Sequence, residues 1–361
     1  MIDQAVLWLS WEVLHHDPCR PFFHRHNDLT SQWGGPNVDN VYRHARIEPG
    51  RRYRIRGRMH SCDNFVLALR RGFMHSEVWG TVETLSAGDR GLGPGDEFEL
   101  LIGGDEPGAL PLAEGVVMVS IREFYFHWLA DEPAVFTIEC LDPDPIAAAP
   151  SSDHAMSGSS ARDLPEPLAT RVDAAFGQMH DSLSYWRSYM ESNRGDRMEN
   201  SFSTDALTVA KGLSLARYEF CFWSLAPHEA LVIECDVPDA EYWGAQLYRM
   251  ETFEPVDLWD AIVSRNHTQT TIAGDGRIYW VLAAQDPGTV NWIDTNGRDT
   301  GLCTIRWFWP QSDARPSPST TLMAQADVAG FIPDDLLPVS AAERARELQS
   351  RRDHLRWRFR V

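Results

Sequence analysis

Four strand-like segments from the first half of this 361-residue chain recur in the same order in the second half, at an offset of roughly 180 residues. One such match carries no weight, because apolar strands resemble one another, but four in order indicate two copies of one β-module. The matched pairs are GRRYRIRG and HEALVIEC, VLALRRGF and GAQLYRMETF, DEFELLIGGDEPG and DGRIYWVLAAQDPG, and VVMVSIREFYFHW and GLCTIRWFWP. We therefore expect a mainly β (α+β) fold of two tandem modules that resemble β-sandwiches or jelly rolls.

Helices are expected before, between and after the modules. Apolar residues at helical spacing predict a short helix in IDQAVLWLSWEVLHH and a long one in LATRVDAAFGQMHDSLSYWRSYMESN. Ser340, with Glu343 three residues later, predicts the start of a third helix. The expected organisation is an N-terminal helix with the first module in residues 1–141, a linker and helix in 142–200, the second module in 201–312, and an extension with a helix in 313–361.

Two further segments are assigned from their composition and alternation. Residues 142–167 are rich in Pro, Ala and Ser, which is typical of a linker. The polar run HTQTTIAG in the second module is expected to be a strand, since its β-branched residues are followed by a glycine turn.

The composition narrows the range of partners. A net charge of −19 disfavours nucleic acids and anionic membranes. No apolar run reaches about 18 residues, and the N-terminal segment lacks the basic region of a signal peptide, so no membrane insertion is expected. The six scattered cysteines are expected to be reduced thiols in a cytoplasmic protein. Gly-x-Ser-x-Gly, Walker A and Gly-x-Gly-x-x-Gly motifs are absent, and we predict no cofactor.

The segment DPGTVNWIDTNGRDTGLCTIRWFWP places Arg306 inside an apolar, aromatic strand, and Arg122 has the matching position in the first module. A guanidinium is tolerated in an interior only when it is paired and hydrogen-bonded. In the architectural interpretation each arginine holds a carboxylate, which is Asp286 or Asp294 for Arg306, and Glu106 or Glu123 for Arg122. In the functional interpretation one or both arginines face a ligand carboxylate or carbonyl.

Several segments resemble a bacterial family known as domain of unknown function 1214, which often occurs beside a sister domain numbered 1254. WGGPNVDNVYRHARIEPGRRYRIRGR is similar to the opening of that family, and FYFHWLADEPAVFTIE to an internal segment. ALVIECDVPDAEYWGAQLY and DGRIYWVLAAQDPGTVNWIDTNGRDTGLCTIRW are similar to its C-terminal signature. The usual Asn-Pro-Asp-Asn is Asn37-Val38-Asp39-Asn40 here. The resemblance covers most of residues 33–310 and implies a β-rich double-sandwich fold, but no agreed activity.

A histidine-rich stretch, LHHDPCRPFFHRHND, offers enough ligands for zinc. The candidate ligands are His15, His16, Asp17, Cys19, His24 and His26. Their spacing matches no established site, and the stretch crosses the end of a predicted helix. We therefore predict no metal site, although the sequence leaves metal binding open.

The candidate site combines aromatic walls with groups that can move a proton. Asp294, if desolvated beside aromatic rings, or His127 would transfer the proton, and Arg306 or Arg122 would orient a polar group. The substrate-binding candidates are Trp292, Trp307, Trp243, Tyr125, Asn291 and His267. Alternating aromatic residues on strands are more often core residues. His127 and His267 could equally be structural histidines, and we favour the structural interpretation for His267.

These residues lead to three hypotheses about function. The first is a cofactor-independent enzyme that acts on a lipophilic or polycyclic small molecule by proton transfer, as an isomerase, cyclase, lyase or hydrolase. The second is a non-catalytic protein whose tryptophans bind a glycan or a hydrophobic ligand. The third is a structural or assembly protein without a ligand. The sequence leaves open the substrate and whether the chain forms a homo-oligomer.

Overall fold

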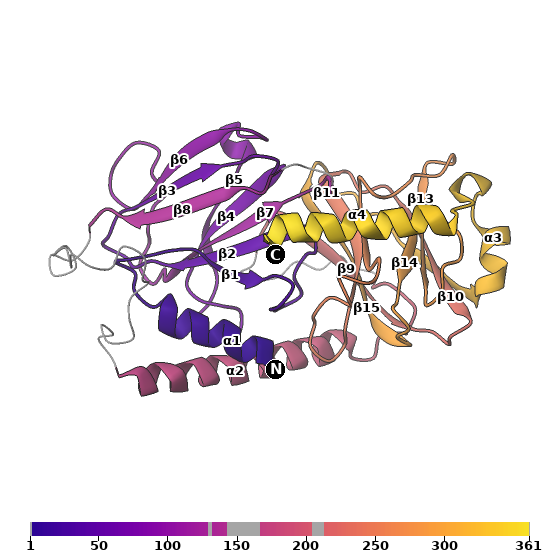
Figure 1. Cartoon of the computed structure of the whole chain (residues 1–361), viewed down its shortest axis with the longest axis horizontal. Helices are drawn as coiled ribbons and strands as arrows, with labels where there is room; N and C mark the ends of the chain where they lie inside the picture. Colours follow the sequence, from indigo (N-terminus) through magenta and orange to yellow (C-terminus); the bar gives the residue numbers. More distant parts are fainter. Residues whose placement is uncertain (1, 129–131, 143–166, 204–212, 361) are drawn as a thin grey trace. The chain divides into compact units, whose positions relative to one another are not determined.

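The computed structural model describes residues 2–128, 132–142, 167–203 and 213–360, and most of the expected linker lies outside these ranges. The chain divides into two compact units (Figure 1). Unit 1 comprises Met1–Trp33, Asn40–Tyr125 and Asp131–Tyr185, and unit 2 comprises Gly34–Asp39, Phe126–Ala130 and Trp186–Val361. The fold is mainly β with a few helices, as the sequence predicts.

Unit 1 is a sandwich of two antiparallel sheets. One sheet joins, in spatial order, β1 (His24–Asn27), β2 (Asn40–Arg46), β7 (Met118–Phe124), β4 (Asn64–Arg70) and β5 (Thr81–Ser86). The other joins β6 (Glu97–Ile102), β3 (Tyr53–Arg58) and β8 (Val135–Cys140). The sheets share an aromatic core, because the ring of Phe65 on β4 lies 5.2 Å from that of Phe98 on β6 and 5.6 Å from that of Phe136 on β8.

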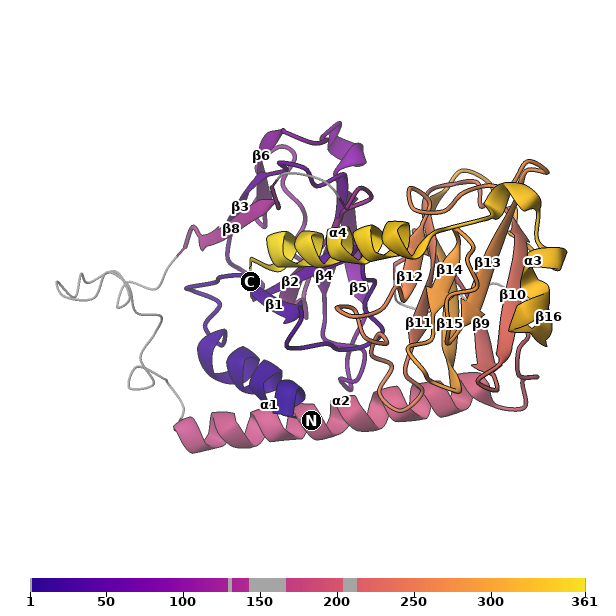
Figure 2. The ribbon, with the colours of Figure 1, turned by 45° about the vertical axis from the view of Figure 1, so that its right-hand side comes forward.

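Unit 2 has the same two-layer construction (Figure 2). One sheet joins β12 (Ser264–Asn266), β11 (Ala240–Tyr248), β15 (Thr300–Pro310) and β9 (Ala216–Ser224). The other joins β14 (Trp292–Asp294), β13 (Arg277–Ala283), β10 (Glu229–Asp236) and β16 (Ser319–Ala324). Trp243 of β11 meets Trp280 of β13 between the layers, with ring centroids 6.0 Å apart.

The two units share one strand topology, which is the structural basis of the sequence repeat. The order β2-β7-β4-β5 corresponds to β9-β15-β11-β12, and β6-β3-β8 to β13-β10-β16, with the strands in the same chain order. Arg122 pairs with Tyr42 across the sheet, and Arg306 pairs with Tyr218. Each guanidinium lies over that tyrosine ring, 5.4 and 5.6 Å from the centroid. The two arginines therefore occupy corresponding positions.

The helices predicted from the sequence are present. α1 (Ile2–Leu9) continues into the π-helical η1 (Ser10–Leu14), α2 covers Leu168–Arg194, and α4 covers Ala341–Phe359. Ser340 and Glu343 form the predicted capping box of α4. The shorter helices are η2 (Gly88–Arg90), η4 (Gln325–Asp327), α3 (Val328–Phe331) and η5 (Asp334–Leu336). Val328 of α3 and Leu336 of η5 pack on Val232 of β10 and Val281 of β13.

The strand predicted in HTQTTIAG is wrong, because β12 ends at Asn266, before that run begins. The side chain of Asn266 accepts a hydrogen bond from Thr268 N over 3.0 Å, and its carbonyl accepts one from Gln269 N over 3.0 Å. An asparagine that bonds the backbone two residues later offers the chain a turn in place of a ladder. The β-branched residues of the run suggest a strand, but this local turn prevails.

Candidate functional site

The segment Gly34–Asp39 lies on the face of β11 that points away from the sandwich interior. Gln246 holds it in place, since its Nε2 donates to Pro36 O over 2.9 Å and its Oε1 accepts from Val38 N over 3.0 Å. Gly35 has a φ of +63°, and a Cβ there would lie 2.3 Å from the ring of Phe253. Only glycine fits at this position. The segment places Asn37 and Asp39 against the sheet.

Asp39 and Tyr242 form a buried pair at the centre of the candidate site. Tyr242 Oη donates to Asp39 Oδ2 over 2.5 Å and accepts from Asn37 Nδ2 over 2.9 Å. Trp128 Nε1 donates to Asp39 Oδ1 over 2.7 Å. Burial, followed by the charge of Asp39, raises the pKa of Tyr242 well above its usual value. The phenol therefore stays protonated and keeps the Asp39 carboxylate in place.

His267 and His127, which the sequence indicates as candidate site residues, lie beside this pair. The ring of His267 is half-buried, 5.8 Å from that of Tyr242 and 4.9 Å from that of Phe126, and its Nδ1 is buried with no hydrogen-bond partner among the described residues. Burial lowers the pKa of His267, Asp39 opposes this, and His127 lowers it further. His127 itself is exposed. At neutral pH His267 is therefore a neutral imidazole that can accept a proton.

Arg306 lies on the same face of the sheet as Tyr242. Its Nη2 donates to Tyr248 Oη, and the guanidinium lies over the rings of Tyr248 and Tyr218. The expected partner Asp286 instead binds Arg344. A phenol and two aromatic faces thus stabilise this buried cation through hydrogen bonding and cation–π attraction.

The expected partners of Arg122 are also engaged elsewhere. Glu106 forms an ion pair with Arg52 over 3.1 Å, and Glu123 forms one with Arg43. Arg122 belongs to unit 1 and is not part of the site in unit 2.

The predicted aromatic walls are core residues. Trp243 and Trp307 are cross-strand neighbours that are 5% and 2% exposed, and Trp243 packs on Trp280 of the opposite sheet. Tyr125 is fully buried in unit 1. These rings offer no open surface on which a sugar could stack.

The loop between β13 and β14 binds α4. Arg344 of α4 donates from Nε to Asp286 Oδ2 over 2.9 Å and lies over the ring of Trp292, 5.1 Å from its centroid. Asn291 exchanges hydrogen bonds of 2.9 and 2.7 Å with the backbone of Thr271. Trp292 and Asn291, predicted to bind substrate, are therefore structural: Trp292 packs under Arg344 of α4, and Asn291 ties the loop to Thr271.

Asp294 has a perturbed acidity, as predicted for a desolvated carboxyl group. Its pKa is raised to about 6, because the group is largely buried and because Asp286 and Asp257 repel its charge. Its Oδ1 accepts a hydrogen bond from Asn296 N over 2.7 Å. It lies on a different sheet from Tyr242 and is not part of the same cluster.

We expect Asp294→Asn to stabilise the protein at neutral pH. The folded-state pKa lies above the unfolded value, so the stability from this group is present in acid and is lost as the pH rises through about 6. Asparagine keeps the acceptor for Asn296 N and removes the charge. After discounting for partial exposure, we expect a gain of about 1–2 kcal/mol at pH 7.5 and none at pH 4. Urea unfolding at both pH values measures it, with the exposed Asp313→Asn as control, and a loss of stability at pH 7.5 would contradict it.

The N-terminal histidines form a buried cluster in unit 1 rather than a row along the chain. Ring centroids are 4.4 Å apart for His15 and His24, 4.9 Å for His24 and His26, and 4.0 Å for His26 and His44 of β2. In the part of the chain that the structure describes, no group of three or more His, Cys, Asp or Glu side chains is arranged to hold a metal ion.

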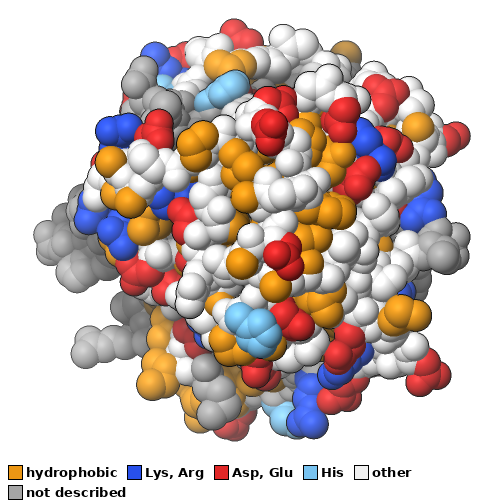
Figure 3. All heavy atoms as spheres, turned by 90° about the vertical axis from the view of Figure 1, so that its right-hand side faces the viewer, with side chains coloured by type: hydrophobic (Ala, Val, Ile, Leu, Met, Phe, Trp, Pro, Cys, Tyr) orange, Lys and Arg blue, Asp and Glu red, His pale blue; other side chains and the backbone are white. Residues whose placement is uncertain are grey.

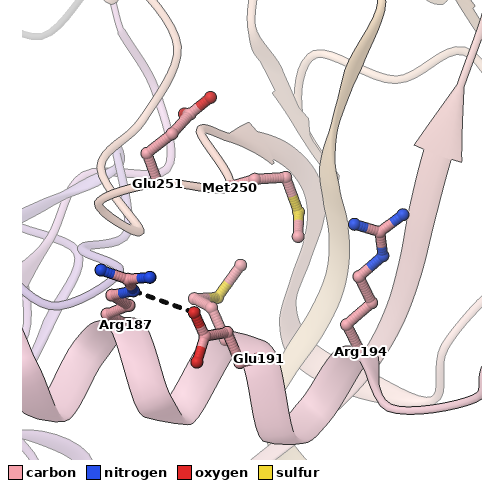
Figure 4. A pocket seen from close by; sticks show the side chains of 6 residues that line it. Arg187, Glu191, Arg194, Met250 and Glu251 are labelled. Atoms are coloured by element: carbon pink, nitrogen blue, oxygen red, sulfur yellow. Dashed lines mark hydrogen bonds and ion pairs between the residues drawn. The ribbon is translucent and has the colours of Figure 1, made fainter.

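Unit 2 contains a cavity of about 430 Å³ beside α2 (Figure 4). It is lined by Arg187, Met190, Glu191, Arg194, Met250 and Glu251. Its charged groups bind one another or nearby residues, since Arg187 pairs with Glu191 over 2.9 Å and Arg194 with Glu199 over 2.7 Å. A ligand at this cavity would have to displace exposed ion pairs.

Figure 3 shows the face of unit 2 at the end where α3, β10 and β16 lie in Figures 1 and 2, with apolar side chains in a band among acidic ones. Leu322 of β16 and Phe331 of α3 are exposed apolar residues of these elements. None of the helices in the described ranges is both long enough and apolar enough to span a membrane.

Comparison with solved structures finds the fold in another protein. An uncharacterized protein from Burkholderia cenocepacia is 23% identical with a TM-score of 0.76, over 90% of this chain and 87% of that chain. A protein from Vibrio parahaemolyticus is 12% identical with a TM-score of 0.47, over 89% of this chain and 98% of that chain. No family model and no curated protein matches the chain. The Burkholderia likeness shows a shared fold and carries no activity.

Proposed function

We propose that this protein is an enzyme that transfers a proton to or from a lipophilic small molecule without a nucleotide cofactor, at the cluster around His267 in unit 2. The observation that carries the proposal is the placement of His267, half-buried and neutral, beside the buried Asp39–Tyr242 pair and within electrostatic reach of exposed His127. Proton transfer needs a base whose charged form, once made, is stabilised by a fixed neighbour.

Each residue of the cluster has a role that follows from its surroundings. His267 accepts the proton, and Asp39 stabilises the imidazolium that forms, since its charge raises the pKa of that ring. Tyr242 and Trp128 fix the Asp39 carboxylate through hydrogen bonds of 2.5 and 2.7 Å. His127, which is exposed, exchanges the proton with solvent. Such a sequence of groups suits isomerisation, cyclisation, elimination or hydrolysis.

The half-buried ring of Phe126 supports a lipophilic substrate. It stacks on Tyr242 at 5.5 Å and lies edge-on to His267, so an apolar molecule beside the imidazole would contact it. The same surface favours a second candidate, a protein that binds a hydrophobic ligand without reaction. Arg306 is a positioning residue in either case, because it binds Tyr248 on the same strand as Tyr242.

We expect the protein to exchange substrate protons with solvent, and His267→Ala to slow that exchange by about 10²–10⁴-fold. The measurement is deuterium incorporation or product formation, followed by mass spectrometry in D₂O, over a panel of polycyclic and polyene ketones, lactones and esters. Tyr242→Phe should lower the rate less, because Trp128 Nε1 still donates to Asp39 Oδ1. The exposed His228→Ala is the matched control.

The two candidate functions separate cleanly in this experiment. A compound that raises the melting temperature but gains no deuterium and forms no product indicates binding alone. Turnover that is equal in the native protein and in His267→Ala, with the variant shown to be folded by circular dichroism, would reject His267 as the base.

A further inference from the structure

A second cavity of unit 2, of about 240 Å³, lies where three turns meet. It is lined by Leu225, Ala226, Pro227, Ala284, Gln285, Thr295, Gly297, Arg298 and Asp299. These residues come from the β9–β10 turn, the start of the β13–β14 loop and the β14–β15 turn, all of which belong to unit 2. Ends of sandwiches and barrels are common places for small-molecule sites.

Two polar groups of the lining are buried without a partner. Thr295 is fully buried, and its Oγ1 has no hydrogen-bond partner among the described residues. Nε of Arg298 is also buried and has no hydrogen-bond partner among the described residues, whereas its Nη2 binds Glu251 over 3.1 Å. A buried donor without a hydrogen bond costs free energy. This cavity has both an unpaired hydroxyl and an unpaired guanidinium N–H in its lining residues, and a ligand oxygen would give them partners. The larger cavity beside α2 has no such pair.

The lining residues also indicate which chemical groups a ligand would have. A guanidinium binds carboxylate oxygens better than neutral acceptors, because the hydrogen bond is charge-assisted. Leu225, Ala226 and Ala284 form an apolar part of the wall that suits a short hydrocarbon body. The exposed Asp299 at the rim repels a second negative charge, which disfavours phosphate and dicarboxylates.

We propose that this cavity is a binding site for a short aliphatic monocarboxylate, with Arg298 and Thr295 as the groups that hold its carboxylate. The site is separate from the His267 cluster and stands whether or not that cluster is catalytic. Its residues belong to the polar turn that precedes β15, so the turn has a binding role in addition to joining β14 to β15.

Butyrate is the probe, and the measurement is isothermal titration calorimetry with the whole protein at pH 7.5. We expect saturable binding of butyrate and none of n-butylamine or inorganic phosphate. Arg298→Gln should abolish it, and Thr295→Val should weaken it about tenfold, since one hydrogen bond to a charged group is lost. Arg194→Gln removes an arginine from the other cavity and should bind butyrate as the native protein does.

Thermal melting separates a lost site from a lost fold. Thr295→Val is close to isosteric and removes an unpaired hydroxyl, so its melting temperature should be unchanged or higher. Absence of saturable butyrate binding to the native protein, or equal affinity in folded Arg298→Gln, would overturn the proposal. Equal binding of phosphate would show a general anion site and would also overturn it.

Discussion

Lowering the pH from 7.5 to 5 is expected to remove about 8 kcal/mol of the free energy of unfolding, through the histidine cluster of unit 1. Burial lowers the pKa of His15 to about 4 and that of His24 to about 3, and it holds those of His26 and His44 well below the usual value. In the unfolded chain all four titrate near pH 6.5.

The direction follows from proton uptake. Above about pH 6.5 a histidine is neutral in both the folded and the unfolded chain, so it does not change the free energy of unfolding. As the pH falls from about 6.5 toward the lowered folded-state pKa, only the unfolded chain takes up the proton, and stability is lost. Each such group removes about 1.4 kcal/mol per pH unit, so four remove about 5.6 kcal/mol per pH unit, or about 8 kcal/mol between pH 6.5 and pH 5. The arginines around the cluster, Arg46, Arg70 and Arg122, oppose protonation, and Glu12 is already bound to Arg46. The Glu12 carboxylate is therefore already used by Arg46 and does not compensate the new charge.

Urea unfolding at pH 7.5, 6.5 and 5.5 measures this slope. His26→Leu removes one of the four titrations at similar volume, so the slope should fall by about 1.4 kcal/mol per pH unit. The exposed His228→Leu should leave the slope unchanged. A native protein equally stable at pH 7.5 and 5.5 would show that the cluster is protonated at little cost, contrary to this expectation.

The sequence predicts elements whose cause is local. Alternating strands such as β6 and β13, and the capped start of α4, follow from side-chain period and from the Ser340–Glu343 pair. The short β14 has no such signal, because three residues are too few to show a period, and its strand conformation depends on parallel pairing with β13. The edge strand β16 is polar in its first half and shows no alternation, so its sequence resembles a loop.

The contacts of the candidate site also depend on residues far apart in the sequence, which local patterns do not predict. His127 and His267 can be selected by residue type, but their neighbour Asp39 is separated from its partner Tyr242 by 203 positions. Only the resemblance of Asn37-Val38-Asp39-Asn40 to a family motif draws attention to that carboxylate. Asp286 likewise finds Arg344 on α4, 58 residues away, and not the arginine of the nearer strand. Packing selects among several equally plausible ion pairs, and no local pattern ranks them.

Glu123→Ala is expected to cost about 3–5 kcal/mol, the second large effect. Glu123 is fully buried between the sheets of unit 1, where it binds Arg43 and accepts from Tyr125 Oη over 2.6 Å. Arg43 is itself only 12% exposed, so removal of the carboxylate leaves a buried cation without its counter-charge. Chemical denaturation of the whole chain measures the loss, and Glu99→Ala, in an exposed ion pair of β6, should cost less than about 1 kcal/mol.

A double variant distinguishes the value of the pair from the cost of breaking it. Arg43→Met with Glu123→Leu replaces both charges by apolar groups, and it should recover most of the loss seen in Glu123→Ala, because the orphaned charge is gone. A double variant as unstable as the single one would show instead that packing around Glu123, and not its charge, is what the fold requires.

Unit 2 offers an internal comparison, because Glu219 corresponds in position to Arg43: they lie opposite Ile305 and Ile121 in their sheets. Glu219 is fully buried and binds Arg315, which is 31% exposed. When Glu219 is replaced by alanine, Arg315 can turn toward water, whereas Arg43 cannot. We therefore expect Glu219→Ala to cost clearly less than Glu123→Ala, although both carboxylates are equally buried. The reverse order would mean that burial of the carboxylate, rather than the confinement of its partner, sets the cost.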